Sequence, residues 1–208
     1  MSRAVAERLG LRYLDTGSMY RALTWLVLDQ GLDPDDERQV ARVAREARLD
    51  VGTDPERPTI AVDGVDVTTA VRETRISQVV SAVSTNLGVR TELVRRQKEL
   101  VEPGGVVVEG RDITTVVAPD APVRVLLTAT AHARVERRAR DVHGHADDAA
   151  VAATRDQVLR RDDDDSTVAE FHEPAIGVVV LDSSTLTFED TVAAVLELVA
   201  AHTSEPVR

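Results

Sequence analysis

The chain has 208 residues, a formal net charge of −11 at pH 7 and no cysteine. A chain of this length folds as one domain, or as one core with a small insertion. The lack of cysteine excludes disulfides, thiol nucleophiles and cysteine-based metal sites. The acidic balance disfavours nucleic acids and anionic membranes as partners, and no apolar run approaches the ~18 residues that cross a bilayer. We therefore expect a cytoplasmic monomer that binds neither nucleic acid nor membrane.

The first half of the chain reads as helices interrupted by short strands. Gly10 closes a helix that is already under way at residue 4. Hydrophobic periodicity then predicts, in chain order, a strand at 11–14, helices at 19–30 and 35–48, strands at 49–51, 59–62 and 65–67, and helices at 72–87 and 90–101. Asp63-Gly64 is a tight-turn signal between two of the short strands. These strands predict a small antiparallel sheet set between helices.

The second half of the chain alternates strands with helices. The continuous apolar runs at 106–108 and 123–127 are typical of buried parallel strands. Helices are predicted at 131–141 and 148–161, a last strand at 177–181, and a C-terminal helix from Thr187. This alternation indicates an α/β fold, in which helices flank a parallel sheet and the antiparallel strands form an insertion.

A first polar cluster, Asp15-Thr16-Gly17-Ser18, lies between a predicted strand and a helix that carries Tyr20 and Arg21. Backbone amides and a hydroxyl at a helix N-terminus suit a phosphate, and Arg21 adds a counter-charge one turn later. The same residues also fit an ordinary helix cap followed by a surface arginine.

A second cluster, Glu109-Gly110-Arg111-Asp112, directly follows a predicted buried strand. Ligands of open α/β sheets bind just beyond the carboxyl ends of the strands, so these charges are well placed for binding. A structural ion pair is the alternative interpretation. A third pair, Ser84 and Arg90, flanks the turn between two predicted helices.

A fourth cluster joins Arg161 to Asp165, which share a helical face because they are four residues apart. Together these two side chains are able to bind phosphate and hydroxyl groups, although an acidic run such as 162–165 is usually a solvated face. His143 and His145 lie in a polar linker without fixed ligand geometry, so we expect no metal site there.

LDTGSMYRA, EGRDITTVVAPDAPVRVLLTA and the pair Arg161…Asp165 resemble the bacterial cytidylate kinases, a family of nucleoside monophosphate kinases. The resemblance covers essentially the whole chain. It implies a P-loop-kinase-like fold over 1–208, with a monophosphate-binding insertion at 46–88 and a lid at 132–168. It also implies transfer of the γ-phosphate of ATP to CMP or dCMP with Mg²⁺.

The resemblance implies a role for each matching residue. Thr16, Arg21 and Arg111 would hold the acceptor phosphate, with Tyr20 beside it. Ser84, Arg90 and Asp112 would bind the cytosine edge, which offers an amino donor to a carboxylate and two acceptors to arginine. Arg161 and Asp165 would meet the phosphate and the ribose, so that Arg111 and Arg161 are the expected catalytic cations. The lid would begin with Arg134, Arg137 and Arg138.

The sequence departs from the family in two places. A P-loop kinase needs a first strand and a glycine-rich loop with Lys and Ser or Thr, but no GxxxxGK(S/T) occurs here, and Lys98, in a predicted helix, is the only lysine. We expect that translation starts further upstream; the alternative is a non-catalytic CMP-binding module. Without the missing strand and loop, the 208 residues should bind CMP but transfer phosphate negligibly. Val168 stands where the family has a further lid arginine.

Overall fold

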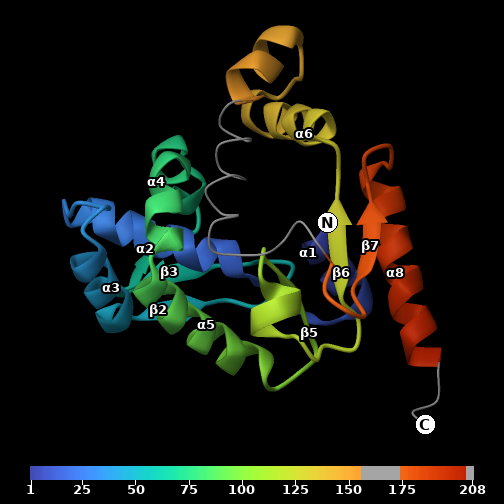
Figure 1. Cartoon of the computed structure of the whole chain (residues 1–208), viewed down its shortest axis with the longest axis horizontal. Coiled ribbons are helices and arrows are strands. Elements are labelled where there is room, and N and C mark those ends of the chain that lie inside the picture. The colour runs from blue at the N-terminus through green and yellow to red at the C-terminus, as the bar shows by residue number, and fades with distance from the viewer. Residues whose placement is uncertain (156–173, 205–208) are drawn as a thin grey trace. The chain divides into compact units, whose positions relative to one another are not determined.

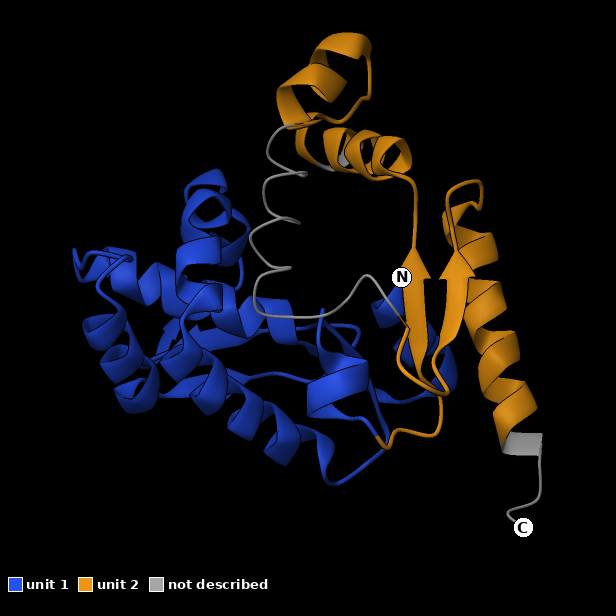
Figure 2. Cartoon of the chain, in the orientation of Figure 1, with its two compact units in different colours: residues 1–119 blue, residues 120–208 orange. Residues whose placement is uncertain are grey.

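The computed structural model describes residues 1–155 and 174–204 (Figure 1). The chain divides into two compact units, Met1–Pro119 and Asp120–Arg208, which Figure 2 shows in different colours. The expected single kinase domain over 1–208, its insertion at 46–88 and its lid at 132–168 stay predictions.

The first unit is built on two parallel strands. β1 (Arg12–Asp15) pairs with β5 (Val106–Glu109) so that Asp15 stands opposite Glu109 at the carboxyl ends of both strands. Helix α1 (Ser2–Leu9) packs on this pair and ends at Gly10, whose φ of 65° forms a left-handed cap. The parallel pairing predicted from the apolar run at 106–108 is confirmed, and it brings two polar clusters to one edge.

A three-stranded antiparallel sheet lies where the sequence predicts one. Its strands are β2 (Leu49–Val51), β3 (Ile60–Val62) and β4 (Val65–Asp66), in the order β2-β3-β4. Asp63 and Gly64 both adopt positive φ, 50° and 82°, as the tight turn between β3 and β4 requires. The predicted antiparallel sheet and its turn are therefore confirmed.

Four helices surround the core of the first unit: α2 (Thr16–Asp29), α3 (Glu37–Glu46), α4 (Thr74–Thr85) and α5 (Leu87–Val101). Their apolar faces meet in one buried cluster that includes Leu14, Met19, Leu23, Val27, Val40, Val83 and Leu93. α5 begins three residues earlier than the predicted 90, because the Asn86 side chain caps it by accepting hydrogen bonds from the amides of Gly88 and Val89.

Two short helical turns in the first unit were not predicted. η1 (Ala70–Arg72) precedes α4, and η2 (Ile113–Val117), a single π-helical turn, follows β5 with residues 110–112 between them. A π turn leaves no periodic apolar signature over five residues, and such turns occur frequently at functional sites.

The second unit contains another parallel pair, β6 (Val125–Thr128) with β7 (Val179–Asp182). Its helices are α6 (Ala131–His143), a helical stretch at 148–155, and α8 (Phe188–Ser204), which is capped by Thr187 as the sequence predicts. The parallel strands flanked by helices confirm the predicted α/β class. In the described residues these strands form two separate pairs rather than one continuous sheet.

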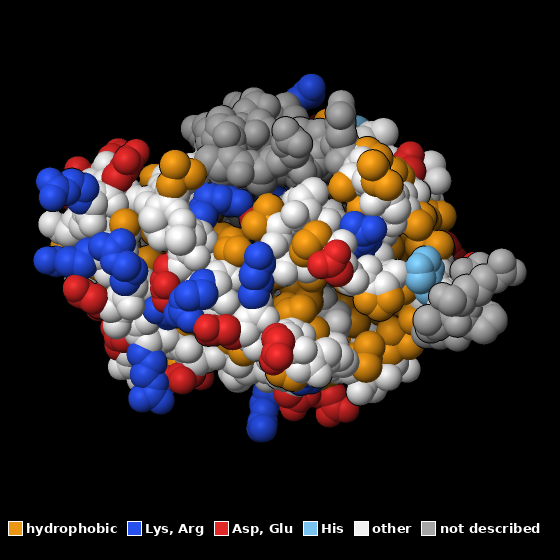
Figure 3. All heavy atoms as spheres, turned by 60° about the horizontal axis from the view of Figure 1, so that its bottom comes forward, with side chains coloured by type: hydrophobic (Ala, Val, Ile, Leu, Met, Phe, Trp, Pro, Cys, Tyr) orange, Lys and Arg blue, Asp and Glu red, His pale blue; other side chains and the backbone are white. Residues whose placement is uncertain are grey.

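The surface mixes charges of both signs. On the face drawn in Figure 3, Lys and Arg side chains are interspersed with Asp and Glu side chains. Several exposed arginines form ion pairs along their own helix, among them Arg3 with Glu7 and Arg95 with Glu99. Within the described residues no helix is long and apolar enough to span a bilayer.

Candidate functional site

The first site element is the edge where β1 and β5 end. Asp15 caps α2 by accepting a hydrogen bond from the Ser18 amide at 3.0 Å. The buried Thr16 hydroxyl donates to the carbonyl oxygen of Glu109 at 2.8 Å. The first bond fixes the start of α2, and the second holds it against the end of β5. The two motifs singled out in the sequence, around Asp15 and around Glu109, therefore lie side by side.

Tyr13 adds a further link at this edge. Its hydroxyl donates to Glu109 Oε1 at 2.7 Å. Burial, and then the negative charge of the Glu109 carboxylate, raise the pKa of Tyr13 well above its ordinary value, so the phenol stays protonated and keeps donating. At the end of the neighbouring strand, β1, Arg72 Nη2 forms an ion pair with Asp15 Oδ2 at 3.0 Å. Sequence reasoning named Glu109 only as part of a cluster and missed Tyr13 and Arg72, because their partners are distant in sequence.

Gly110 is required by the close contact between these segments. A Cβ at this position would lie 2.2 Å from Thr16 Oγ1 and 2.8 Å from Ile113 Cδ1, where no such atom fits. Any larger residue must therefore push Thr16 away from Glu109, or displace η2.

We accordingly expect Gly110→Ala to lower the free energy of unfolding by about 1–3 kcal/mol, the usual cost of overpacking. Urea unfolding of the single variants and of the double variant with Thr16→Ala tests the mechanism. Removing the Thr16 hydroxyl should cost less in the Gly110→Ala background than in the native chain, since the clash is then relieved. Strictly additive effects would show that the contact between these two residues is not the cause.

The second site element is Arg21, which reaches from α2 to α4. Its Nη1 donates to Ser77 Oγ at 3.1 Å and to the carbonyl oxygen of Val71 at 3.4 Å. The side chain is half-buried, and its neighbour Tyr20 is 8% exposed. Arg21 is thus held in one place by α4 and is not a freely moving surface arginine, the alternative that the sequence left open.

The third site element is an ion pair between Arg90 and Asp112. Arg90 Nη2 lies 2.5 Å from Asp112 Oδ2, and the two side chains are 16% and 7% exposed. Arg90 Nη1 also donates to the carbonyl oxygen of Ser84 at 3.4 Å. The structure therefore brings together Ser84, Arg90 and Asp112, which belong to the end of α4, the first turn of α5 and the segment after β5.

α4 connects the Arg21 contact to the Arg90 pair. Ser77, Ser81 and Ser84 follow the spacing i, i+4, i+7 and therefore share one face of the helix. At ~1.5 Å per residue, Ser77 and Ser84 lie roughly 10 Å apart along the axis. The Ser84 hydroxyl donates a hydrogen bond to the Ser81 carbonyl oxygen at 3.3 Å and so satisfies a carbonyl group near the end of α4. Sequence reasoning missed Ser77 and Ser81, although their helical spacing was a readable signal.

The remaining predicted residues lie next to this cluster, in the second unit, or outside the described residues. Arg111 is half-buried next to Asp112. In the second unit, the guanidinium of Arg137 donates to Ser183 Oγ at 3.0 Å and to the carbonyl oxygen of Ser183. Arg134 and Arg138 lie on the same helix, α6, and are half-buried. Arg161 and Asp165, together with Val168, lie outside the described residues.

Comparison with known proteins shows the family of this chain. The family model described as cytidylate kinase matches residues 1–201. The chain belongs to the cytidylate kinase family. It is 46% identical to a cytidylate kinase from Cutibacterium acnes over 95% of this chain and 88% of that protein. Cytidylate kinases from Streptomyces avermitilis and Nocardia farcinica are each 42% identical, over 95% and 98% of this chain and 85% and 89% of their own lengths. The family resemblance that the two motifs indicated is thereby confirmed.

Proposed function

We propose that this protein transfers a phosphoryl group from ATP to CMP or dCMP and so produces the nucleoside diphosphate. Family membership supports the class of reaction. The identity of the phosphate acceptor is inferred from the groups along α4. Arg21 is hydrogen-bonded to Ser77 near the start of this helix, and the buried pair of Arg90 and Asp112 lies at its end, where Arg90 donates to Ser84. Ser77, which accepts from Arg21, and Ser84, whose carbonyl oxygen accepts from Arg90, are roughly 10 Å apart along the axis of α4, which is comparable to the length of a nucleoside monophosphate.

The Arg90–Asp112 pair fits the cytosine edge chemically. Cytosine offers an exocyclic amino group, which a carboxylate accepts, and a carbonyl oxygen and ring nitrogen, which arginine donors bind. The pair is largely buried, so its hydrogen bonds are formed away from competing water. Uracil presents a carbonyl where cytosine has the amino group, and that oxygen would face the Asp112 carboxylate. We infer that Asp112 selects CMP over UMP.

The acceptor phosphate is assigned to Arg21, with Thr16, Arg111 and Tyr20 around it. A guanidinium binds a phosphate through two parallel hydrogen bonds, and Arg21 already has its side chain ordered by Ser77. In-line transfer needs no covalent protein intermediate, since positioning and charge stabilisation supply most of the catalysis. Arg161, Asp165 and the α6 arginines stay predictions for the ribose and the lid.

Magnesium would reach the site together with the nucleotide. Asp15 and Glu109 stand in register at the carboxyl ends of β1 and β5, and carboxylate oxygens are ligands that Mg²⁺ prefers. Within 1–155 and 174–204, no group of three or more potential ligands is close enough to hold a metal. The carboxylates of Asp15 and Glu109 would suit an ion whose other ligands are phosphate and water oxygens, and such an ion would neutralise phosphate charge.

Replacing Asp112 with asparagine tests the assignment of the base. The amide side chain would keep the shape and donate a hydrogen bond to the uracil carbonyl, so discrimination between CMP and UMP should shrink by about 1–3 kcal/mol. Titration calorimetry with both nucleotides measures it. Should CMP and UMP affinities fall in equal proportion, Asp112 does not select the base.

A non-catalytic CMP-binding module is the second candidate function, because no GxxxxGK(S/T) occurs in the 208 residues. Two measurements address the candidates. The first is CMP binding by calorimetry, and the second is the release of ADP from ATP in the presence of CMP, dCMP, UMP or AMP. Release with CMP or dCMP above the other nucleotides supports the kinase. CMP binding without release is expected of both candidates while the P-loop is missing, so the assay is then repeated with a strand and a GxxxxGK(S/T) loop restored at the N-terminus. Release from the extended chain supports the kinase, and continued lack of release supports the binding module. Absence of CMP binding contradicts both.

A further inference from the structure

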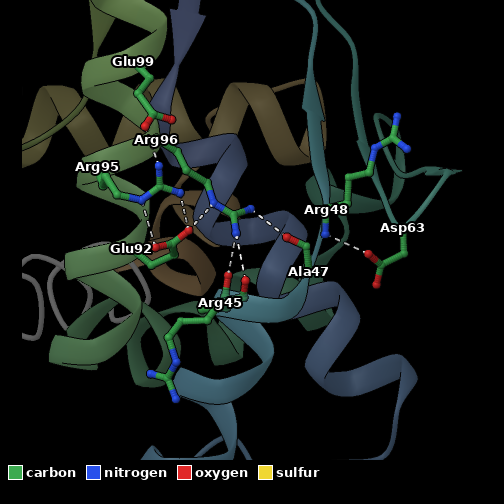
Figure 4. A network of polar contacts seen from close by, with 9 residues as sticks. Arg45, Ala47, Arg48, Asp63, Glu92, Arg95, Arg96 and Glu99 are labelled. Atoms are coloured by element: carbon green, nitrogen blue, oxygen red, sulfur yellow. Dashed lines mark hydrogen bonds and ion pairs between the residues drawn. The ribbon is translucent and has the colours of Figure 1, made fainter.

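Arg96, on α5, caps the C-terminal end of α3 (Figure 4). Its guanidinium donates to the carbonyl oxygens of Ala44 at 3.0 Å, Arg45 at 3.4 Å and Ala47 at 2.7 Å. The last carbonyls of a helix have no partner within the helix, and the helix dipole favours a cation beside them. The planar guanidinium reaches all three oxygens at once. Arg96 therefore fixes the end of α3 to α5.

Glu92 holds the guanidinium of Arg96 in this orientation. Its Oε1 accepts from Arg96 Nε at 2.6 Å and from Arg95 Nη2 at 2.7 Å (Figure 4). Hydrogen bonds from Arg95 and then Arg96 lower the pKa of Glu92 to about 2, so the carboxylate is ionised at neutral pH. The Arg96 and Glu92 side chains are only 17% and 16% exposed, which distinguishes them from a solvated surface pair.

A second hydrogen bond holds the other end of the same two helices. Asn86 Nδ2, at the start of α5, donates to the carbonyl oxygen of Glu37, the first residue of α3, at 2.9 Å. The anchored positions, Glu37 and Ala47 on one side and Asn86 and Arg96 on the other, are ten residues apart in each case. The two helices therefore run side by side in the same direction, joined at points about 15 Å apart. Arg90 lies between these two points.

We propose that Arg96 is a positioning residue for the Arg90–Asp112 pair. This inference rests on the proposed function of that pair in binding cytosine. Asp112 is placed by β5, whereas Arg90 is placed by α5, so their geometry depends on where α5 lies. Arg96 and Asn86 set that position against α3. Without Arg96, only the Asn86 hydrogen bond joins α5 to α3 by side chain within the described residues, so α5 can pivot about that end and displace Arg90 relative to Asp112.

The test compares Arg96→Met with the matched control Arg95→Met. Arg95 is the adjacent residue and binds the same Glu92 carboxylate, but its side chain contacts Glu92 and Glu99 on its own helix and is 53% exposed. Calorimetric affinities for CMP and UMP are measured for each variant. Because hydrogen bonds to a base edge supply much of the discrimination between bases, we expect Arg96→Met, which displaces Arg90, to reduce the CMP-to-UMP affinity ratio by about tenfold. Arg95→Met should leave the ratio unchanged within about twofold.

A second step separates positioning from general loss of structure. If Arg96 acts through the pair, Asp112→Asn should lower the ratio in the native background but add little in the Arg96→Met background. Arg96→Lys retains a cation near Glu92 and serves as the second variant if Arg96→Met does not fold. It should give a CMP-to-UMP affinity ratio between those of the native chain and Arg96→Met. An unchanged ratio in both Arg96 variants, or equal loss of CMP and UMP affinity, overturns the inference. A native chain that does not prefer CMP over UMP overturns the proposed function instead.

Discussion

Arg21→Ala is expected to weaken CMP binding by about 2–5 kcal/mol while leaving cytidine binding almost unchanged. Arg21 is held by Ser77 and the Val71 carbonyl, so under the proposed function it would bind the phosphate of CMP without first losing the freedom of a mobile side chain. Truncation removes the bidentate donor and leaves the phosphate unpaired in a half-buried site. Cytidine has no phosphate and should not sense the change.

Titration calorimetry with CMP and cytidine measures this difference directly. Arg42→Ala is a suitable control, because Arg42 lies on α3, is 62% exposed and contacts Glu46 at 3.9 Å. The control should change neither affinity, since exposed pairs of this kind contribute little. Equal losses for CMP and cytidine in Arg21→Ala would instead indicate damage to α4, through the lost Ser77 contact.

Much of the fold could be predicted from local patterns. The apolar run at 106–108 indicated a parallel strand, and the Asp63-Gly64 turn indicated a hairpin, because each depends on residues adjacent in the chain. The strand is half-buried rather than fully buried as predicted. The meeting of the Asp15 and Glu109 motifs was also predictable in kind, since the carboxyl ends of parallel strands share one edge. Which strands pair depends on the whole core, and no single segment records it.

The contacts that could not be predicted from the sequence are those in which a buried side chain joins segments distant in the chain. Arg96 lies in a highly charged helix directly after Arg95, and nothing in the local sequence distinguishes the two arginines. Only the position of α3 makes Arg96 half-buried while Arg95 stays exposed. Ser77 had a readable helical spacing to Ser84 but no signal for its contact with Arg21. The resemblance grouped Arg90 with Asp112, which are 22 residues apart, whereas residue patterns alone did not.

Arg90→Met is expected to lower the free energy of unfolding by about 3–5 kcal/mol, because it leaves the Asp112 carboxylate buried without its partner. Asp112 is 7% exposed on its side chain, so water cannot replace the guanidinium at low cost. Urea unfolding monitored by circular dichroism measures the loss. Arg95→Met, on the exposed side of the same helix, should leave stability almost unchanged.

The double variant Arg90→Met with Asp112→Leu separates stability from recognition. Replacing both members of a buried ion pair by apolar residues of similar volume is often neutral or stabilising, so the double variant should regain most of the stability lost in Arg90→Met. CMP binding should stay lost in both variants, because the donors and acceptor for cytosine are then gone. A double variant that recovers stability and CMP affinity together would show that the pair only supports the fold. A double variant that recovers neither would show that the pair is not the source of the lost stability.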